Sequence, residues 1–247
     1  MTKKIAVVTG GTGGLGTAAC RALCQQGRRV VATYFDGDQE NAAAWQQSMQ
    51  EQSFEVAVYP VDISDFASCQ ELIARITADI GPVDILINNA GITRDSTLKK
   101  MSVEQWQAVI STDLNGVFNM TRQVFEGMMT RGWGRVVNIS SVNGQKGQFG
   151  QVNYSAAKAG VHGFAMAAAQ EGARKGVTVN TISPGYIGTE MTLAVAEEMR
   201  QQIIAQIPVG HMGAPEDIGR TVAFLCDDAA GFITGADFSI NGGLHMG

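Results

Sequence analysis

The chain has 247 residues, of which 45% are apolar and 17% are charged, and its formal net charge is −5. This share of apolar side chains is enough for a sizeable core and excludes a disordered chain. A mildly acidic chain is a poor binder of nucleic acid, and no apolar run approaches the ~20 residues of a membrane span. We therefore expect a cytoplasmic globular protein that binds neither nucleic acid nor membrane.

Short apolar runs alternate with stretches of helical spacing along the whole chain. The first run, residues 5–9, is continuous, which is typical of a strand buried on both faces of a parallel sheet. The predicted strands are residues 5–9, 29–33, 56–61, 85–88, 135–139, 177–182 and 237–240. The first predicted helix ends near residue 26, and the others are residues 39–50, 65–80, 103–131, 152–175, 191–206 and 215–226.

This order of elements predicts the fold class. Strands that alternate with helices form parallel sheets through right-handed crossovers. We expect an α/β protein with a Rossmann fold, in which helices flank a doubly wound, seven-stranded parallel sheet. Because no repeat, low-complexity tract or linker interrupts the pattern, residues 1–247 are expected to form a single domain.

A glycine-rich segment lies between the first predicted strand and the first predicted helix. It reads Thr9-Gly10-Gly11-Thr12-Gly13-Gly14-Leu15-Gly16. Backbone N–H groups at a helix start, together with the helix dipole, can hold a pyrophosphate, and glycine lets the backbone come close to it. The patterns G-x-G-x-x-G and T-G-x-x-x-G-x-G both fit, so the segment predicts a dinucleotide site, with an ordinary tight turn as the alternative.

The end of the second predicted strand bears on the choice between NAD and NADP. Dinucleotide folds often place an acidic residue there when the cofactor is NAD. In this chain Tyr34 and Phe35 hold that place, and Asp36 follows directly. No arginine stands there to bind a 2′-phosphate, so these residues leave both cofactors open.

Tyr154 and Lys158 are four residues apart on a predicted helix, so they share one face, one turn apart. A phenol has a pKa near 10, but a nearby ammonium group stabilises the phenolate. Lowering this pKa by about three units corresponds to roughly 4 kcal/mol. The pair is therefore a candidate general acid and base, although an isolated pair of this spacing is usually a helix surface contact.

Small and polar residues end three of the predicted strands. Asn88–Gly91 follow the fourth strand, Ser141 follows the fifth, and Pro184 with Gly185 ends the sixth. Ligands of doubly wound sheets bind at the carboxyl ends of the strands. A serine hydroxyl there can bond a substrate carbonyl and offset charge that develops on its oxygen. The three strand ends and the Tyr154 helix face together predict one catalytic crevice.

These features resemble the short-chain dehydrogenase/reductase family over essentially the whole chain. The residues that carry the resemblance are Thr9, Gly10, Gly14, Gly16, Asp62, Asn88–Gly91, Asn115, Ser141, Tyr154, Lys158, Pro184 and Gly185. The resemblance implies a nicotinamide-dependent oxidoreductase in which Tyr154 protonates the carbonyl oxygen and Ser141 polarises the carbonyl. It implies that Lys158 bonds the nicotinamide ribose and lowers the Tyr154 pKa, and that Asn115 holds a water linking Lys158 to solvent.

The resemblance also implies a set of cofactor-binding residues from several strand ends. They are Gly10, Thr12, Gly13, Gly14, Leu15 and Gly16 at the phosphates, Asp62 and Ile63 at the adenine, Asn89, Ala90 and Gly91 at the adenosine ribose, and Pro184, Gly185, Ile187 and Thr189 at the nicotinamide, with Tyr154 and Lys158. NADP(H) is the cofactor that the resemblance favours. NAD(H) stays open because Gly13 stands where many NADP-using members carry arginine.

Within the family, four segments resemble the acetoacetyl-CoA reductase branch of polyhydroxyalkanoate synthesis. They are residues 88–95, 131–135, 140–151 and 241–247. This resemblance implies an acyl-CoA substrate, reduced to the (R)-3-hydroxy thioester, and an acyl pocket walled by the loop before Tyr154. The substrate contacts it suggests are Asp95, Ser141, Gln148, Phe149, Gln151 and Tyr186.

The alternative substrate is a 3-oxoacyl group on a carrier protein, which the same chemistry would reduce. An enzyme of that kind needs basic residues beside its pocket to dock an acidic carrier. The candidates are Arg122, Arg131, Arg174 and Lys175, which are equally suited to be solvated helix ends.

The remaining features concern location, metals and assembly. The four cysteines form no C-x-x-C pair and have no histidine at metal spacing, so we expect reduced thiols and no metal site. The first residues lead directly into an apolar strand, so no signal peptide is expected. The predicted helices 103–131 and 152–175 carry more apolar surface than one sheet face needs, and the family resemblance implies a homotetramer.

Overall fold

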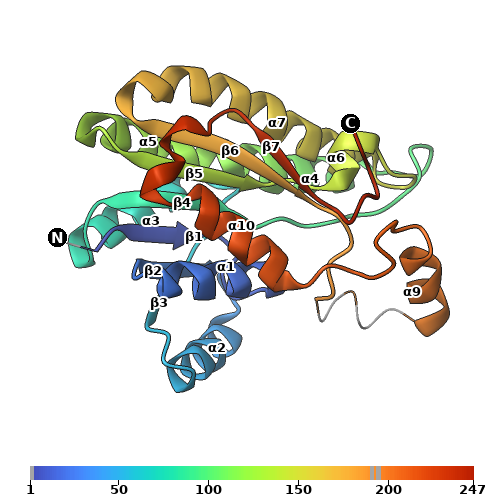
Figure 1. Ribbon diagram of the computed structural model, residues 1–247, viewed down its shortest axis with the longest axis horizontal. Coiled ribbons are helices and arrows are strands. Elements are labelled where there is room, and N and C mark those ends of the chain that lie inside the picture. The colour runs from blue at the N-terminus through green and yellow to red at the C-terminus, as the bar shows by residue number, and fades with distance from the viewer. Residues whose placement is uncertain (1–2, 190–191, 193–195) are drawn as a thin grey trace.

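The computed structural model describes residues 3–189, 192 and 196–247 (Figure 1). Within these residues, seven strands form one sheet in the order β3-β2-β1-β4-β5-β6-β7, and each neighbouring pair is parallel. The strands are β1 (Ile5–Val8), β2 (Arg29–Tyr34), β3 (Val56–Pro60), β4 (Val83–Asn88), β5 (Gly134–Ile139), β6 (Val177–Pro184) and β7 (Asp237–Ile240). The predicted fold class is confirmed.

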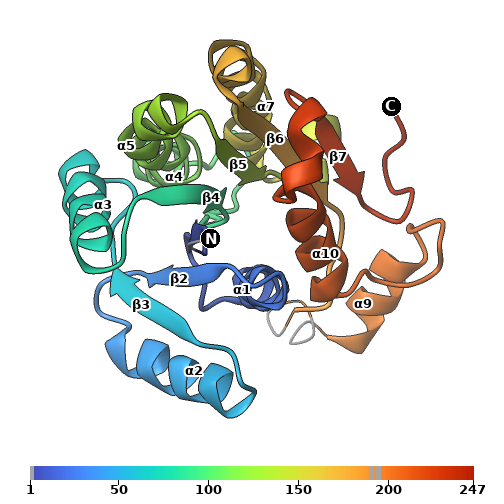
Figure 2. The same ribbon diagram turned by 60° about the vertical axis from the view of Figure 1, so that its left-hand side comes forward.

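Helices cover both faces of this sheet, as Figure 2 shows. The helices are α1 (Gly14–Gln25), α2 (Gln39–Glu51), α3 (Phe66–Asp79), α4 (Val103–Ile110), α5 (Gly116–Arg131), α6 (Val142–Lys146), α7 (Val152–Gly172), α9 (Glu197–Ile204) and α10 (Pro215–Leu225). Buried residues of α1, α2 and α10 pack on one face, and buried residues of α3, α5 and α7 pack on the other.

The continuous apolar runs of the strands follow from this burial on two sides. Val8 belongs to the apolar cluster with α1 and α10, whereas its neighbour Val7 belongs to the cluster with α3 and α5. Successive side chains of a strand point to opposite faces, so a sheet covered on both faces needs apolar residues at every position. All of β1 and all of β6 are accordingly buried.

Two predicted helices differ from the structure. The predicted helix 103–131 is divided into α4 and α5 by a π-helical turn, Ser111–Asn115, which accommodates an extra residue in one turn. The predicted helix 191–206 is described as α9, and its first residue, Met191, lies outside the described residues. The short helix α6 was not predicted, because five residues are too few to show helical periodicity.

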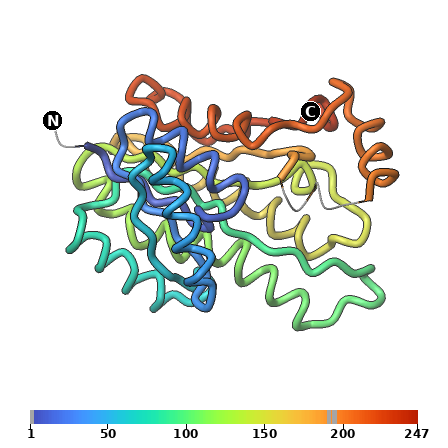
Figure 3. The backbone as a smooth tube through the Cα atoms, turned by 90° about the horizontal axis from the view of Figure 1, so that it is seen from below, coloured from blue at the N-terminus to red at the C-terminus, as the bar shows by residue number. Residues whose placement is uncertain are grey.

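Figure 1 shows that the carboxyl ends of the strands point toward the end of the molecule that carries α6 and α9. In Figure 3 the orange segment that holds α9 lies at the opposite end of the molecule from the N-terminus. The segments that follow β1, β4, β5 and β6 therefore meet at this end, where the sequence predicts the crevice. No helix in the described part of the chain is long and apolar enough to cross a membrane.

Candidate active site

The glycine-rich turn after β1 presents backbone rather than side chains to the site. Gly13 precedes the first residue of α1 and no side chain caps the helix start. A Cβ atom at Gly16 would lie 2.2 Å from the carbonyl oxygen of Gly10, and one at Gly14 would lie 3.0 Å from Cγ2 of Thr189. The turn therefore has the open N–H groups and the lack of side chains that a pyrophosphate needs, and it fits a dinucleotide.

The same turn is tied to the segment that follows β4. Thr9 Oγ1 accepts hydrogen bonds from the backbone N–H groups of Asn89 at 2.9 Å and Ala90 at 3.0 Å. Asn89 Nδ2 donates to the carbonyl oxygens of Thr9 at 2.9 Å and Gly10 at 3.0 Å. The structure thus brings Asn89 and Ala90 to the glycine-rich turn, and it uses the Asn89 amide to hold the two segments together.

Asp62 and Ile63 follow β3 on the other side of this turn. Asp62 Oδ1 accepts hydrogen bonds from Ser64 N at 2.9 Å and Ser64 Oγ at 2.7 Å, which fixes the orientation of its carboxylate. Ile63 is buried, and its carbonyl oxygen accepts from Asn119 Nδ2 at 2.8 Å. The assignment of both residues to the adenine stays a prediction.

The segment after β6 lies against the glycine-rich turn from the opposite edge. Gly185 N donates to the carbonyl oxygen of Ile240 at 2.9 Å, which continues the pairing of β6 with β7. Ile187 forms an isolated parallel bridge with Gly213. Because a Cβ atom at Gly14 would lie 3.0 Å from Cγ2 of Thr189, the segment predicted for the nicotinamide comes close to the predicted phosphate turn.

Tyr154 and Lys158 lie one turn apart on α7, as the spacing predicts. Lys158 Nζ is 5.5 Å from the centroid of the Tyr154 ring and donates to the carbonyl oxygen of Ile139, the last residue of β5, at 3.1 Å. Ser140 Oγ donates to the carbonyl oxygen of Lys158 at 2.9 Å. The end of β5, which carries Ser141, is therefore fastened to α7 at Lys158.

Lys158 has a buried ionic partner, Asp113, which the sequence analysis did not name. The Lys158 Nζ and Asp113 Oδ2 atoms are 3.3 Å apart, and the two side chains are 5% and 0% exposed. Asp113 Oδ1 accepts from the backbone N–H of Ile92 at 2.8 Å. A Cβ atom at Gly91 would lie 2.8 Å from Asp113 Oδ2 and 3.2 Å from Lys158 Nζ, so a glycine is needed beside the pair.

The structure places Asp113, and not Asn115, against Lys158, and the water-holding role that the resemblance gives Asn115 stays a prediction. Asn115 ends the π-helical turn and is exposed, whereas Asp113, two residues earlier, is fully buried. Residues two positions apart on a helical turn point to nearly opposite sides, so only one of them can face α7. The π turn therefore directs Asp113 toward α7.

Burial and ion pairing act in opposite directions on this pair. Burial raises the pKa of the Asp113 carboxyl, although the Lys158 ammonium and the Ile92 N–H lower it. Burial lowers the pKa of Lys158, but Asp113 and then Tyr154 raise it, and the result is a pKa above the ordinary lysine value. We take the lysine as a protonated ammonium at neutral pH that faces a carboxylate in a site of low polarity.

Two of the predicted substrate residues form a hydrogen-bonded chain that leads to Ser141. Gln151 Nε2 donates to Asp95 Oδ2 at 2.8 Å, and Gln151 Oε1 accepts from Asn143 Nδ2 at 2.9 Å. The backbone N–H of Asn143 donates to Ser141 Oγ at 3.1 Å. Asn143 was missing from the prediction, and its only signal in the sequence is its place two residues after the serine.

Gln148 and Phe149 lie in the turn that follows α6. Lys146 Nζ donates to Gln148 Oε1 at 3.2 Å, so this amide is held beside the helix end. The Phe149 side chain is 87% exposed. An exposed aromatic ring on the turn next to the predicted site is available to a ligand, and its assignment to the acyl chain stays a prediction.

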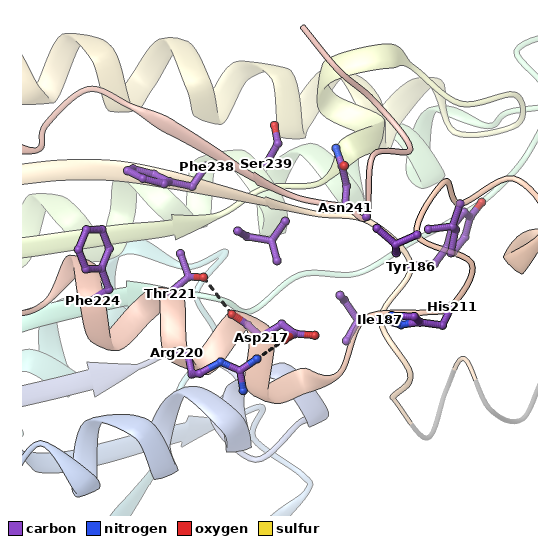
Figure 4. A pocket seen from close by; sticks show the side chains of 15 residues that line it. Tyr186, Ile187, His211, Asp217, Arg220, Thr221, Phe224, Phe238, Ser239 and Asn241 are labelled. Carbon is purple, nitrogen blue, oxygen red and sulfur yellow. Dashed lines mark hydrogen bonds and ion pairs between the residues drawn. The ribbon is translucent and has the colours of Figure 1, made fainter.

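Tyr186 and Ile187 line a cavity of about 610 Å³ between α10, β7 and the segment 207–213 (Figure 4). Asp217 on α10 faces this cavity and pairs with Arg220. The described residues that line it include none of the residues around the Lys158 ammonium. The predicted contact between Tyr186 and a substrate stays a prediction.

Comparison with known proteins decides the family. The family model described as short chain dehydrogenase matches residues 4–200. The chain belongs to the short-chain dehydrogenase family. This short-chain dehydrogenase is therefore a nicotinamide-dependent oxidoreductase, as the resemblance implies.

Three curated relatives of this short-chain dehydrogenase match it over nearly the full length of both chains. The acetoacetyl-CoA reductase of Rhizobium meliloti is 57% identical over 98% of this chain and 99% of its own. The acetoacetyl-CoA reductase of Allochromatium vinosum is 54% identical over 98% and 99%. The 3-oxoacyl-[acyl-carrier-protein] reductase of Escherichia coli is 41% identical over 98% of each chain.

Proposed function

We propose that this short-chain dehydrogenase reduces acetoacetyl-CoA to (R)-3-hydroxybutanoyl-CoA with a reduced nicotinamide cofactor. The observation that carries the proposal is the set of full-length relatives named acetoacetyl-CoA reductase, which are 46–57% identical to this chain. The relative that acts on a carrier protein is 41% identical. The resemblance of the segments around Ser141 and at the C-terminus supports the same substrate.

Two of the four basic residues that could dock a carrier protein already have partners within the chain. Arg131 Nη2 donates to the carbonyl oxygen of Val83 and pairs with Asp84 at 3.4 Å. Arg122 lies 4.0 Å from Glu126 on the same helix. Because their charges are offset within the chain, these two arginines offer an acidic carrier less attraction than free cations would.

In the proposed reaction, Tyr154 donates its phenolic proton to the carbonyl oxygen of the substrate. When bound, the reduced nicotinamide supplies the hydride that adds to the carbonyl carbon. Ser141 Oγ hydrogen-bonds the carbonyl oxygen, and thereby orients it and stabilises the charge that develops there. Lys158 binds the nicotinamide ribose through its ammonium, and the charge of that ammonium stabilises the phenolate that Tyr154 leaves when it gives up its proton.

The cofactor would be held by the strand ends described above. The residues we assign to it are Gly10, Thr12, Gly13, Gly14, Leu15, Gly16, Asp62, Ile63, Asn89, Ala90, Gly91, Tyr154, Lys158, Pro184, Gly185, Ile187 and Thr189. The resemblance favours NADP(H). NAD(H) stays open, because the chain has no lysine or arginine between Arg29 and Arg75 to bind a 2′-phosphate, and Asp36 and Asp38 follow β2.

One assay tests the substrate and the cofactor together. We expect the absorbance of the reduced nicotinamide to fall when acetoacetyl-CoA is added, with NADH and NADPH compared at equal concentration. The ratio of the two rates assigns the cofactor, and chiral analysis of the product should give the (R) thioester. Absence of oxidation with either cofactor, combined with turnover of a 3-oxoacyl carrier protein, would assign the alternative substrate instead.

We also propose that the enzyme is a cytoplasmic homotetramer. Apolar side chains are exposed on neighbouring helices, among them Val103 and Trp106 on α4, Phe118 on α5 and Met166 on α7, and such surface is typical of a subunit interface. The free thiols of all four cysteines suit a reducing compartment.

Light scattering tests the assembly. We expect a mass four times that of the 26.2 kDa chain at micromolar concentration. Replacement of Trp106 and Phe118 by glutamate should reduce that mass, because buried carboxylates would oppose an apolar contact. A monomeric mass for the unaltered protein would contradict the proposal.

A further inference from the structure

The buried carboxylate of Asp113 changes the electrostatics that the proposed mechanism requires of Lys158. A protonated lysine stabilises the Tyr154 phenolate, whereas a carboxylate beside the lysine opposes that effect. The Lys158 and Asp113 side chains are almost completely removed from water, so solvent screens their charges weakly. Tyr154 therefore experiences an ion pair and not an isolated cation.

The other groups that contact the pair directly are a backbone carbonyl oxygen and a backbone N–H group. The carbonyl oxygen of Ile139, at the end of β5, accepts from Lys158, and the N–H of Ile92, after β4, donates to Asp113. On α7, Tyr154 is one turn before Lys158, and His162, one turn after it, lies 2.8 Å from Ser140 Oγ and 3.7 Å from Asp237. Among the described residues, Asp113 is thus the anion that contacts the lysine.

We propose that Asp113 is a positioning residue that holds Lys158 and offsets its charge, so that the ion pair sets the proton affinity of Tyr154. The inference rests on the proposed role of Tyr154 as the general acid. By keeping the phenol protonated, the ion pair favours reduction, because the phenol must carry its proton before it can protonate a carbonyl oxygen. A lysine without the carboxylate would ionise the phenol at lower pH.

Asp113→Asn removes the negative charge and keeps the shape of the side chain. The Ile139 carbonyl oxygen still accepts a hydrogen bond from Lys158, and the amide oxygen of the new side chain takes the place of the carboxylate oxygen that lies 3.3 Å from the ammonium. Burial lowers the Lys158 pKa, but the Tyr154 phenolate raises it, so the ammonium is retained once the phenol ionises. The phenolate of Tyr154 is then stabilised by a cation with no opposing anion.

The ionisation of Tyr154 is measured directly, by ultraviolet titration of its phenolate. The titration of a matched protein with Tyr154→Phe is subtracted, so that the difference reports this one tyrosine. We expect Asp113→Asn to move the midpoint to lower pH by about one unit. The midpoint of the pH–rate profile for alcohol oxidation, which needs the ionised phenol, should move in the same direction.

Two further variants make the result interpretable. Glu171→Gln removes one negative charge from an exposed position on the same helix, more than three turns from Lys158, and should leave the midpoint unchanged. If Asp113→Asn does not fold, Asp113→Ser removes the same charge with a smaller side chain, and the same shift is expected. An unchanged midpoint, a midpoint at higher pH, or an equal shift in Glu171→Gln would overturn the proposal.

The titration also separates this inference from the proposed substrate. If the unaltered enzyme does not turn over acetoacetyl-CoA but its Tyr154 midpoint responds to Asp113→Asn as expected, the substrate is wrong and the electrostatic role stands. If turnover occurs and the midpoint does not move, the substrate stands and the role of Asp113 is rejected.

Discussion

Tyr154→Phe should lose turnover by about 100- to 10,000-fold, which is the contribution that a positioned general acid makes. The substitution removes one hydroxyl group and keeps the half-buried ring that packs beside Lys158. The carbonyl oxygen would then have to take its proton from water, while the glycine-rich turn and the strand ends remain intact. We therefore expect normal folding and normal cofactor affinity with almost no reduction of the substrate.

Tyr59→Phe is the matched control for this experiment. It also removes a single phenolic hydroxyl, which hydrogen-bonds Asp79 at 2.9 Å, and it lies on the edge strand β3, four positions along the sheet from β5. Steady-state rates and cofactor binding of both variants should be compared at the same pH. If Tyr154→Phe kept more than about a tenth of the turnover, Tyr154 would not be the general acid.

Lys158→Met should abolish activity and also destabilise the folded protein by about 3–5 kcal/mol, because it leaves the Asp113 carboxylate buried without its partner. Methionine retains an unbranched apolar stem of similar length, so the packing of α7 against β5 changes little. The free energy of unfolding, measured by urea denaturation at fixed protein concentration, reports this loss.

The pH dependence of that loss identifies its source. Burial raises the pKa of Asp113 and Lys158 opposes the rise, so removal of the lysine raises this pKa further. A carboxyl group with a raised pKa in the folded state destabilises folding above that pKa, and the penalty fades as the pH falls and the group binds a proton. The free energy of unfolding that Lys158→Met loses relative to the unaltered enzyme should therefore be largest at neutral pH and should become smaller in acid.

A double variant separates stability from catalysis. Asp113→Asn combined with Lys158→Met replaces the ion pair with two neutral side chains, and it should recover most of the lost stability without recovering turnover. If the double variant were as unstable as Lys158→Met alone, the buried carboxylate would not be the cause of the destabilisation. If Lys158→Met retained turnover, Lys158 would have no role in the chemistry.

The sequence by itself determined the sheet, the glycine-rich turn and the pairing of Tyr154 with Lys158. Each of these depends on residues close together in the chain. The continuous apolar run of β1 reflects burial on both faces, and a spacing of four places two side chains on one helix face. The order of strands and helices then restricts the topology, because parallel crossovers are right-handed.

Only the tertiary structure decided which residue faces Lys158. Asp113 and Lys158 are 45 positions apart, and the apolar spacing of residues 103–131 continues through the π turn that directs Asp113 inward and Asn115 outward. Asn115 was expected from the family resemblance, and an acidic residue in a helical stretch is usually solvated, so no pattern in the sequence pointed to Asp113. The contact arises because the π turn, the segment after β4 and the end of β5 meet at Lys158 on α7, and only the packed sheet brings them together.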